Sequence, residues 1–269
     1  MPFTPPADTT VIAELLGPDS GWPDLRHVTE TGSTNKDVAA LALAGAAEGL
    51  ALISEHQTSG KGRFDRPWQA PPGSSVGLSV LLRPTRTISD WSWLPLVAGL
   101  AVLRGVRALA PSELEAGRVG LKWPNDVLVD GTGKICGILA ERHDTSLGAA
   151  AVVGMGINVD LAADELPAPT ATSLAAIGFD TDKNRLVAHV LAELASLYQT
   201  WQSRGHLREA YAKDSLTLGQ QVRVEMSPTT SVTGQATDID ASGALVVQTD
   251  RGPVTFMAGD VHHLRPHRG

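Results

Sequence analysis

The sequence predicts an α+β fold, in which helices cover a mixed, largely antiparallel sheet, followed by a small C-terminal SH3-like β-barrel. Helical and strand patterns alternate irregularly along the chain, without the regular βαβ repeat of a parallel sheet. Several strand patterns in the middle of the chain are joined by short turns, which favours antiparallel pairing. After Leu218 only short alternating segments remain, separated by turn residues, and this pattern is typical of a small barrel.

In the first half of the chain, helices are expected before and after the first strand in sequence order. A short helix over Asp8–Leu16 should stop at Gly17-Pro18, and a strand over Leu25–Glu30 should follow. Thr34 and Asp37 fit a capping box, which predicts a helix that starts there and continues over 38–47. The other elements expected here are a buried strand over Leu50–Ser54, a loop over Gln57–Gly73, a strand over Val76–Leu82 and a buried helix over Trp91–Leu109.

The second half is expected to add strands, two helices and the tail. Turn signals at Pro124-Asn125-Asp126 and Asp130-Gly131 separate the first of these strands. Strands are predicted over Val119–Trp123, Val127–Val129, Ile135–Glu141 and Ala150–Ile157, and helices over Lys183–Ser203 and His206–Lys213. The tail strands are predicted over Val222–Met226, Val232–Ile239, Leu245–Thr249 and Val254–Met257. The change of pattern places a domain boundary near Leu216–Gly219, which divides the chain into residues 1–216 and 217–269.

Composition excludes several classes of protein. With 42% hydrophobic and 19% charged residues the chain reads as globular, and a net charge of -7 argues against a general nucleic-acid binder. Cys136 is the sole cysteine, so no intramolecular disulfide can form and a reducing compartment is expected. The N-terminus lacks a signal-peptide pattern, and the longest apolar runs are shorter than the roughly 20 residues of a membrane span. A cytoplasmic protein without a membrane partner is therefore expected.

The loop over Gln57–Gly73, here called the cationic loop, is the first candidate for chemistry. Its glycine-rich stretch lacks the third glycine of a dinucleotide fingerprint, and no Ser or Thr follows Lys61 as in a P-loop. It carries Lys61, Arg63 and Arg66, with Trp68 just beyond. Glycines let a backbone wrap closely around an anion, and guanidinium groups bind phosphate in bidentate fashion. A solvated basic loop is the alternative.

Two further segments carry candidate residues. Leu121–Asp126 ends a lysine-bearing strand in a turn, and Lys134 opens the return strand, so a carboxylate, an amide and two ammonium groups could share one region. An ordinary Asn/Asp turn is the alternative. The segment Ser33-Thr34-Asn35 stands at a helix start, where capping is the simplest role.

Taken together, the motifs resemble those of biotin protein ligases. The segments are 30–35 (ETGSTN), 55–63 (EHQTSGKGR), 122–126 (KWPND), 134–139 (KxxGIL), 154–158 (GxGIN) and 172–174 (TSL), in that order. The resemblance covers roughly Thr29 to Leu174, and the barrel-like tail also suits the family. It implies a ligase core like that of class II synthetases, which activates biotin with ATP and Mg²⁺ as co-substrates and transfers it to a lysine of a biotin carboxyl carrier domain. A lipoate or octanoate ligase of the same fold is the alternative.

The resemblance also implies roles for individual residues. Lys134, Arg63 and Asp126 would be catalytic, with Asp126 acting on the incoming lysine. The residues that would hold biotin are Ser33, Thr34, Asn35, Gln57, Gly60, Lys61, Gly62, Arg63, Lys134, Gly137 and Gly154. The residues that would hold ATP are Lys61, Arg63, Arg66, Trp68, Lys122, Asn125 and Asn158. Mg²⁺ would arrive on the triphosphate, and no metal site formed by the chain itself is expected.

Several positions depart from the family pattern or fall outside it. Lys61 replaces an arginine, and Asp65 replaces a glycine, which should exclude glycine-only backbone angles there and add a negative charge. Cys136 is interpreted as a core thiol without catalytic role. The cluster His262, His263 and His267 is interpreted as a solvated tail, because its spacing suits no metal. Only about 28 acidic, proline-rich residues precede Thr29, so a monofunctional ligase without a DNA-binding domain or specific DNA partner is expected.

Overall fold

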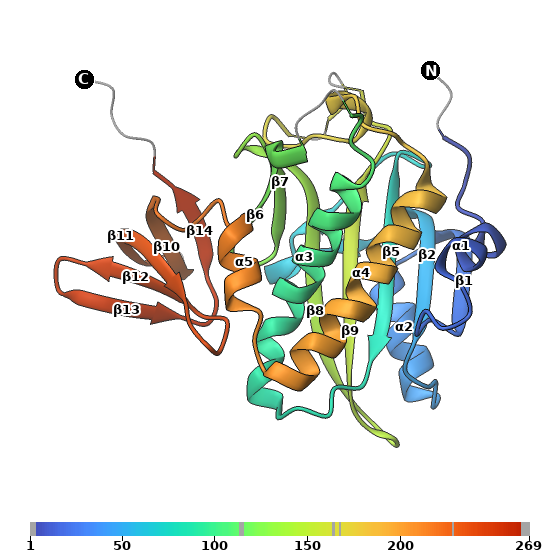
Figure 1. Cartoon of the computed structure of the whole chain (residues 1–269), viewed down its shortest axis with the longest axis horizontal. Helices are drawn as coiled ribbons and strands as arrows, with labels where there is room; N and C mark the ends of the chain where they lie inside the picture. Colours follow the sequence, from blue (N-terminus) through green and yellow to red (C-terminus); the bar gives the residue numbers. More distant parts are fainter. Residues whose placement is uncertain (1–3, 113–115, 163–164, 167, 228, 265–269) are drawn as a thin grey trace.

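A seven-stranded sheet forms the centre of the computed structural model, which describes residues 4–112, 116–162, 165–166, 168–227 and 229–264 (Figure 1). Its strand order is β1-β2-β5-β9-β8-β7-β6. The strands are β1 (Asp24–Thr31), β2 (Leu50–Gln57), β5 (Ser75–Leu82), β6 (Val119–Lys122), β7 (Asp126–Val129), β8 (Gly133–Thr145) and β9 (Gly148–Asn158). Strands β1 and β2 pair in parallel and every other described pair is antiparallel, which confirms the predicted mixed, largely antiparallel sheet.

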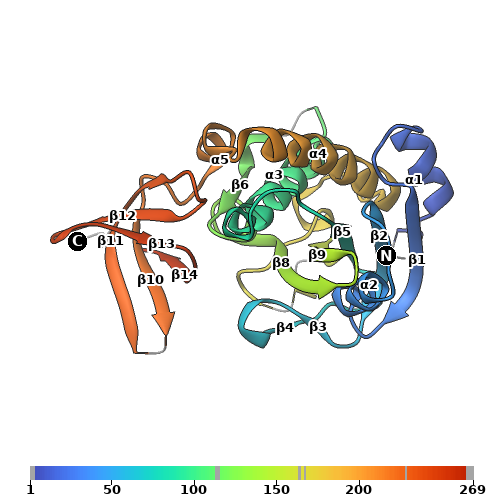
Figure 2. The same cartoon turned by 90° about the horizontal axis from the view of Figure 1, so that it is seen from below.

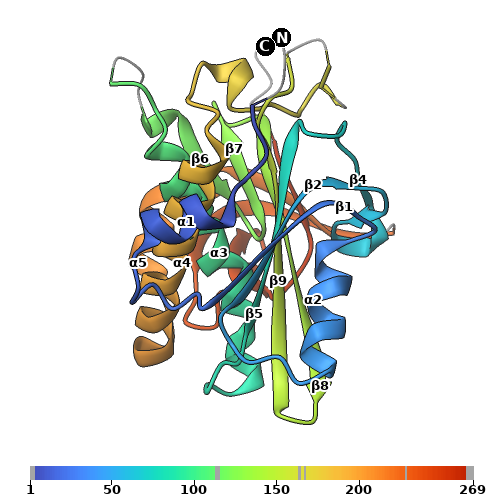
Figure 3. The ribbon, with the colours of Figure 1, turned by 90° about the vertical axis from the view of Figure 1, so that its right-hand side faces the viewer.

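Helices cover both faces of this sheet. The helices are α1 (Thr9–Leu16), α2 (Thr34–Leu43), α3 (Leu94–Arg107), α4 (Lys183–Arg204) and α5 (Arg208–Asp214). Short 3-10 turns occupy Arg63–Asp65, Ile88–Trp93, Ala116–Arg118 and Ala175–Ile177. Helices α3 and α4 lie side by side on one face, and α2 lies on the other (Figures 1 and 3). Every residue of β5 is buried, because this central strand is covered on both faces.

The hydrophobic core is therefore divided by the sheet. The larger cluster fills the space between the sheet and helices α3 and α4, and includes Leu78, Leu100 and Leu191, which are wholly buried. The smaller cluster lies under α2 and includes Val38 and Leu81. Alternate residues of one strand serve the two clusters, as the two-residue period of a β-strand requires.

The start of α2 corrects the predicted capping box. Ser33 is the N-cap residue, and among the described residues its side chain makes no capping hydrogen bond. The backbone N–H of Thr34 instead donates to Oε1 of Gln57 on β2, at 2.9 Å. Asp37 accepts a hydrogen bond of 2.5 Å from the Thr31 hydroxyl rather than completing a box with Thr34. The first helix N–H is thus satisfied by Gln57 from β2, and not by a side chain of the helix start itself, as the capping box predicted.

Two other helix boundaries also differ from the sequence prediction. Helix α2 ends at Leu43, four residues before the predicted end, because Gly45 has a φ of +94° that breaks the helix. Helix α3 begins at Leu94, since Ile88–Trp93 forms a 3-10 turn and Pro95 lies in the first turn of the helix. The predicted loop over Gln57–Gly73 contains a small hairpin of β3 (Gly60–Lys61) and β4 (Pro67–Trp68).

The tail forms a five-stranded antiparallel sheet in the order β13-β12-β11-β10-β14, as the alternating pattern predicts. Its strands are β10 (Gln221–Ser227), β11 (Thr230–Ile239), β12 (Leu245–Thr249), β13 (Gly252–Phe256) and β14 (Asp260–His263). Strand β14 was not predicted from the sequence. It contains His262 and His263, so these two residues belong to a strand and not to a free tail, although His262 is exposed as expected. His267 lies outside the described residues.

Two buried indole groups join the tail to the large sheet. Trp93 donates from Nε1 to the carbonyl of Ala241 at 2.8 Å, and Trp123 donates from Nε1 to the carbonyl of Gly243 at 3.0 Å. Trp123 follows the last residue of β6, so its hydrogen bond places the tail next to the end of that strand. The boundary at residue 216 itself stays a prediction. No described helix is long and apolar enough to cross a membrane.

Candidate functional site

A cavity of about 390 Å³ lies on the face of the sheet that α2 covers. Helix α2 and hairpin β3–β4 lie together on this side of the sheet, opposite α3 and α4 (Figure 2). Fifteen of the seventeen predicted site residues line the cavity: Ser33, Thr34, Asn35, Gln57, Lys61, Gly62, Arg63, Arg66, Trp68, Asn125, Asp126, Lys134, Gly137, Gly154 and Asn158. Gly60 and Lys122 lie outside this lining. The structure thus brings together residues as far apart in the sequence as Ser33 and Asn158.

One part of the cavity lining is formed by neutral polar side chains that are hydrogen-bonded to one another. A single carboxylate, that of Glu141, bonds to this network. The Thr34 hydroxyl donates to Oε1 of Gln57 at 3.1 Å. The wholly buried hydroxyl of Ser79 lies 2.6 Å from the Thr34 hydroxyl and 2.7 Å from Oδ1 of Asn35. The Asn35 amide donates in turn to Glu141 at 2.6 Å. These bonds fix the amide and hydroxyl orientations before any ligand arrives, which suits recognition of a neutral polar head group.

Glycines on β8 and β9 make room for side chains that form the floor of the cavity. Gly137 and Gly156 are register partners, and a Cβ atom at Gly156 would lie 2.5 Å from Cε2 of Trp68. A Cβ atom at Gly154 would lie 2.1 Å from Oδ1 of Asn35. In this structure the indole of Trp68 and the amide of Asn35 therefore occupy the space that the glycines leave. Direct contact of Gly137 and Gly154 with biotin stays a prediction.

The cationic loop lines another part of the cavity. Arg63 donates from Nη1 to Oδ1 of Asn125 at 3.3 Å and to the carbonyl of Gly259 at 3.1 Å. Burial lowers the pKa of Arg63, although the nearby carboxylates of Asp260 and Asp126 oppose this shift. Arg66 forms an ion pair with Asp260 at the start of β14. The tail thus supplies both a carbonyl and a carboxylate to the loop.

The two departures from the family pattern in this loop pair with each other. Lys61 lies 2.6 Å from Asp65, and this contact raises the pKa of Lys61 and lowers that of Asp65. Asp65 has a φ of +55°, in the left-handed region that favours glycine. The expectation that Asp65 excludes such angles is therefore wrong. Aspartate is one of the side chains that tolerate this region, because its short carboxylate can bond locally.

Asp126 and Lys134 both line the cavity and form an ion pair with each other. Their carboxylate and ammonium lie 2.6 Å apart, since β7 and β8 are neighbours in the sheet. The ammonium of Lys134 also lies 5.9 Å from the centre of the Trp68 ring. Lys122 is the register partner of Asp126, and burial lowers its pKa, with Lys134 and Arg66 adding to the effect and Asp126 and Asp260 opposing it. Lys122 therefore lies close to Asp126 but outside the cavity lining, and its contact with ATP stays a prediction.

Asn125 and Asn158 use part of their amides for structure. The Asn125 side-chain N–H donates to the carbonyl of Ile138 at 2.8 Å, and that of Asn158 donates to the carbonyl of Thr172 at 2.9 Å. The Asn158 amide also lies 3.5 Å from the carbonyl of Lys134. Both residues hold the turns around Lys134 in place, and their contact with nucleotide stays a prediction.

The charge of the cavity lining is opposite in sign to that of the whole protein. Four cationic side chains (Lys61, Arg63, Arg66 and Lys134) and two carboxylates (Asp126 and Asp260) line it, which gives a formal charge of +2. The chain as a whole carries a net charge of -7. Cations that are held in place around one cavity favour the binding of an anion there. Among the described residues no cluster of three or more His, Cys, Asp or Glu is arranged to hold a metal ion.

Several site residues escaped sequence reasoning. Ser79 and Glu141 complete the polar network, Gly156 accommodates Trp68, and Asp260 faces Arg66. Gly156 belongs to a quoted motif and could have been found from it. Ser79 and Glu141 stand inside predicted strands, where no local signal separates them from neighbouring polar residues, and Asp260 begins β14, which was not predicted. Cys136 is wholly buried and burial raises the pKa of its thiol, which agrees with the core interpretation.

Comparisons with known proteins agree with this geometry. A model of the biotin/lipoate A/B protein ligase family matches residues 29–158, and a model of the biotin protein ligase C terminal domain matches residues 217–264. The chain is 42% identical to the biotin–[acetyl-CoA-carboxylase] ligase of Mycobacterium tuberculosis over 97% of each sequence. It is 32% identical to the protein of the same name from Paracoccus denitrificans, over 87% of this chain and 98% of that one.

A solved structure extends the likeness to three dimensions. The biotin protein ligase from Aquifex aeolicus in complex with biotin and ATP matches with a TM-score of 0.73 and 26% identity, over 91% of this chain and 100% of that one. The fold and the cavity define a ligase of the biotin and lipoate class. The tail match and the identity to the Mycobacterium enzyme are more specific: the chain belongs to the biotin protein ligase family.

Proposed function

We propose that the protein activates biotin with ATP and transfers it to a lysine of a biotin carboxyl carrier domain. In the first step a carboxylate oxygen of biotin attacks the α-phosphorus of ATP, and the bond to pyrophosphate breaks. In the second step the lysine amine attacks the acyl carbon of biotinyl-5'-AMP, and AMP leaves with the bonding electrons. The acetyl-CoA-carboxylase ligase names of the two relatives support a carboxylase carrier domain as the partner. The ATP requirement and the buried thiol favour a cytoplasmic location.

The polar part of the cavity lining suits the ureido head of biotin. A ureido group offers one carbonyl acceptor and two N–H donors, and Ser33, Thr34, Asn35 and Gln57 belong to this part. Ser79 and Glu141 lock Asn35 in one orientation, so its amide is aligned without cost when biotin binds. A site that hydrogen-bonds both donors and acceptors rejects ligands that lack them, since its buried groups would be left unpaired. This preference favours biotin over lipoate, which has no ureido group.

The cationic part of the lining suits the phosphates. A carboxylate must approach a phosphate that is itself negative, so repulsion dominates unless preorganised cations offset it. Arg63 and Lys134 are placed for this role, because both line the cavity, Arg63 from the cationic loop and Lys134 from β8. Arg66 and Lys61 each hold a carboxylate partner in this structure, from Asp260 and Asp65. Mg²⁺ enters as part of the MgATP substrate and further neutralises the triphosphate.

Asp126 is assigned to the transfer step. A lysine ammonium with an ordinary pKa near 10.4 must lose a proton before it can attack. The ion pair with Lys134 holds the Asp126 carboxylate in the lining of the cavity. A carboxylate there can orient the incoming ammonium and accept its proton, while Lys134 stays close to the acyl phosphate.

The carrying observation is one cavity that is lined both by a preorganised network of neutral polar groups and by four cationic side chains. The test is to incubate the purified protein with ATP, Mg²⁺ and a carrier domain, and to supply either biotin or lipoate. Mass spectrometry of the carrier should show one lysine gaining a biotinyl group. Modification by lipoate with none by biotin would overturn the proposal.

A further inference from the structure

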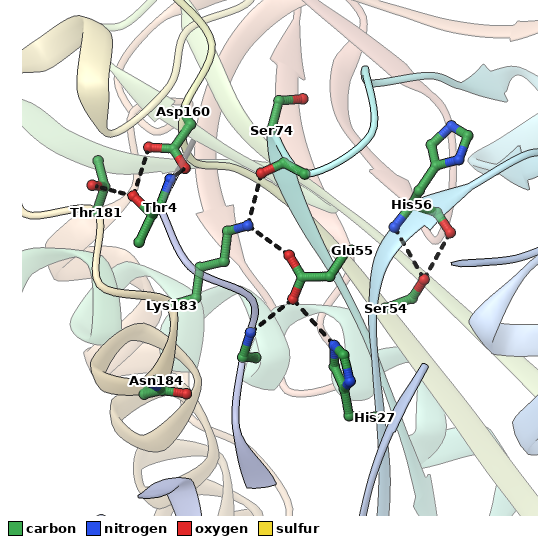
Figure 4. Close-up of polar contacts among 12 residues, drawn as sticks. Thr4, His27, Ser54, Glu55, His56, Ser74, Asp160, Thr181, Lys183 and Asn184 are labelled. Carbon is green, nitrogen blue, oxygen red and sulfur yellow. Dashed lines mark hydrogen bonds and ion pairs between the residues drawn. The ribbon is translucent and has the colours of Figure 1, made fainter. Parts of the chain in front are cut away.

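A buried ion pair lies outside the cavity, where the mechanism does not use it. Glu55 on β2 and Lys183 at the start of α4 are 4% and 1% exposed, and their carboxylate and ammonium lie 2.5 Å apart (Figure 4). The carboxylate also accepts a hydrogen bond of 2.9 Å from the backbone N–H of Ala7, and Nε2 of His27 lies 3.3 Å away. Neither charged residue lines the cavity that holds the proposed reaction.

The pair ties together the two ends of the cationic loop. Glu55 stands two residues before Gln57, where the loop begins, and Gly73 stands where it ends. The backbone N–H of Gly73 donates to the carbonyl of Glu55 at 3.1 Å. The ammonium of Lys183 donates both to the Glu55 carboxylate and, at 2.7 Å, to the carbonyl of Gly73. One side chain of α4 therefore contacts the strand that enters the loop and the backbone that leaves it.

The segments around this tie hold it in place. Ser74, next to Gly73, accepts backbone hydrogen bonds from Val159 and Asp160 at 3.0 and 2.9 Å. Asp160 in turn accepts hydrogen bonds from the backbone and hydroxyl of Thr4, which lies 2.7 Å from the hydroxyl of Thr181 (Figure 4). The N-terminal segment is thus bonded to the segment that holds Ser74, next to the end of the loop. A second cavity of about 380 Å³ borders Glu55, Gly73 and Lys183 on their remaining side.

The residue types indicate more than a contribution to stability. Burying two charges costs several kcal/mol, and replacing a buried ion pair with apolar residues is often neutral or stabilising. An apolar pair could fill the space, but it could not fix the direction of the Gly73 carbonyl. The ammonium does so, and the loop between the tied ends carries Lys61, Arg63 and Arg66.

We infer that Glu55 and Lys183 are positioning residues for biotin activation: they fix the base of the cationic loop so that its cations reach the α-phosphate. The inference rests on the proposed function. Misplacing a catalytic group by about 1 Å costs on the order of 10²-fold in rate. The transfer step relies on Asp126 rather than on the loop, so loosening the loop base should slow activation and leave transfer unchanged.

The experiment uses the double variant Glu55→Gln with Lys183→Met, which removes both charges of the buried pair and shortens only the side chain at position 183, by one atom. A second variant, Leu186→Ala, removes a wholly buried core residue one turn further along α4 and serves as a stability-matched control. Three quantities are measured below the unfolding range of each protein. They are the single-turnover rate of biotinyl-5'-AMP formation, the rate of transfer from preformed biotinyl-5'-AMP, and the rate of tryptic cleavage within residues 61–66 of the ligand-free protein.

For the double variant we expect activation to fall at least tenfold, with a higher KM for ATP. We also expect cleavage in the loop to rise about tenfold, and transfer to stay within twofold of the wild type. The control should match the wild type in all three. Activation and cleavage rates equal to those of the control would overturn the inference. If the wild type forms no adenylate, the proposed function fails, and the cleavage rates still decide whether the pair fixes the loop.

Discussion

Replacing Gly154 with alanine should selectively weaken biotin binding. The new Cβ atom would lie 2.1 Å from Oδ1 of Asn35, and because a carbon–oxygen contact needs about 3.3 Å, the amide must move by about 1 Å. Asn35 is held there by hydrogen bonds of 2.7 Å from Ser79 and 2.6 Å to Glu141. Moving the amide breaks one or both of these bonds, at about 1–3 kcal/mol.

That range corresponds to a rise of roughly 5- to 150-fold in the KM for biotin, since every 1.4 kcal/mol is tenfold. The KM for ATP should stay within about twofold, because the cationic part of the lining is not touched. Ser79→Ala should raise the KM for biotin in the same direction, since it removes the hydroxyl and adds no atoms. Gly117→Ala is the control, because its Cβ atom meets nothing within 4 Å.

The assay is biotin-dependent pyrophosphate exchange with biotin and ATP varied in turn. An unchanged KM for biotin in Gly154→Ala would refute the assignment of Asn35 to the biotin head group. Equal rises in both KM values would show instead that the substitution distorts the whole cavity.

Three other predictions concern the chemistry and the tail. Arg63→Ala and Lys134→Ala should each lower the rate of pyrophosphate exchange by about 10²-fold or more, the loss typical of a preorganised charge partner; a smaller loss would move that residue out of the activation step. Asp126→Asn should slow transfer from preformed biotinyl-5'-AMP by about 10²-fold while exchange stays within a few-fold, and the deficit should shrink as the pH rises toward the lysine pKa; equal damage to both steps would place Asp126 at the nucleotide. Burial lowers the pKa of His263 below 6.5, so the unfolded chain binds the proton more tightly and stability is lost as the pH falls through that value. Urea unfolding at about pH 7.5 and pH 5.5 should therefore show a smaller loss in the free energy of unfolding for His263→Gln than for the wild type. An equal loss in the two proteins would contradict the pKa shift.

The sequence predicts the sheet and the helices well, because these depend on local periodicity. The central strand Ser75–Leu82 and the helix Leu94–Arg107 follow from apolar runs bounded by turn residues. The start of α2 shows where this logic fails. The backbone N–H of Thr34 bonds to Gln57, which is twenty-three residues away. A capping rule considers only residues near the helix start, so it predicted the wrong hydrogen-bond partner.

The candidate site divides in the same way. Residues that belong to a spaced motif, such as Arg63 and Lys134, could be predicted because the motif itself marks them. Ser79 and Asp260 could not, since each acts through a partner that only the folded chain brings near. The tail histidines are a further case: His263 lies in a strand because it pairs with Val222, forty-one residues earlier.

Biotin-dependent exchange of labelled pyrophosphate into ATP tests the central claim most directly, because it reports activation alone and needs no acceptor protein. The account predicts that label enters ATP only when biotin is present, that lipoate does not replace biotin, and that Lys134→Ala removes at least about 99% of the rate. Exchange that proceeds without biotin, or with lipoate in its place, would contradict the account.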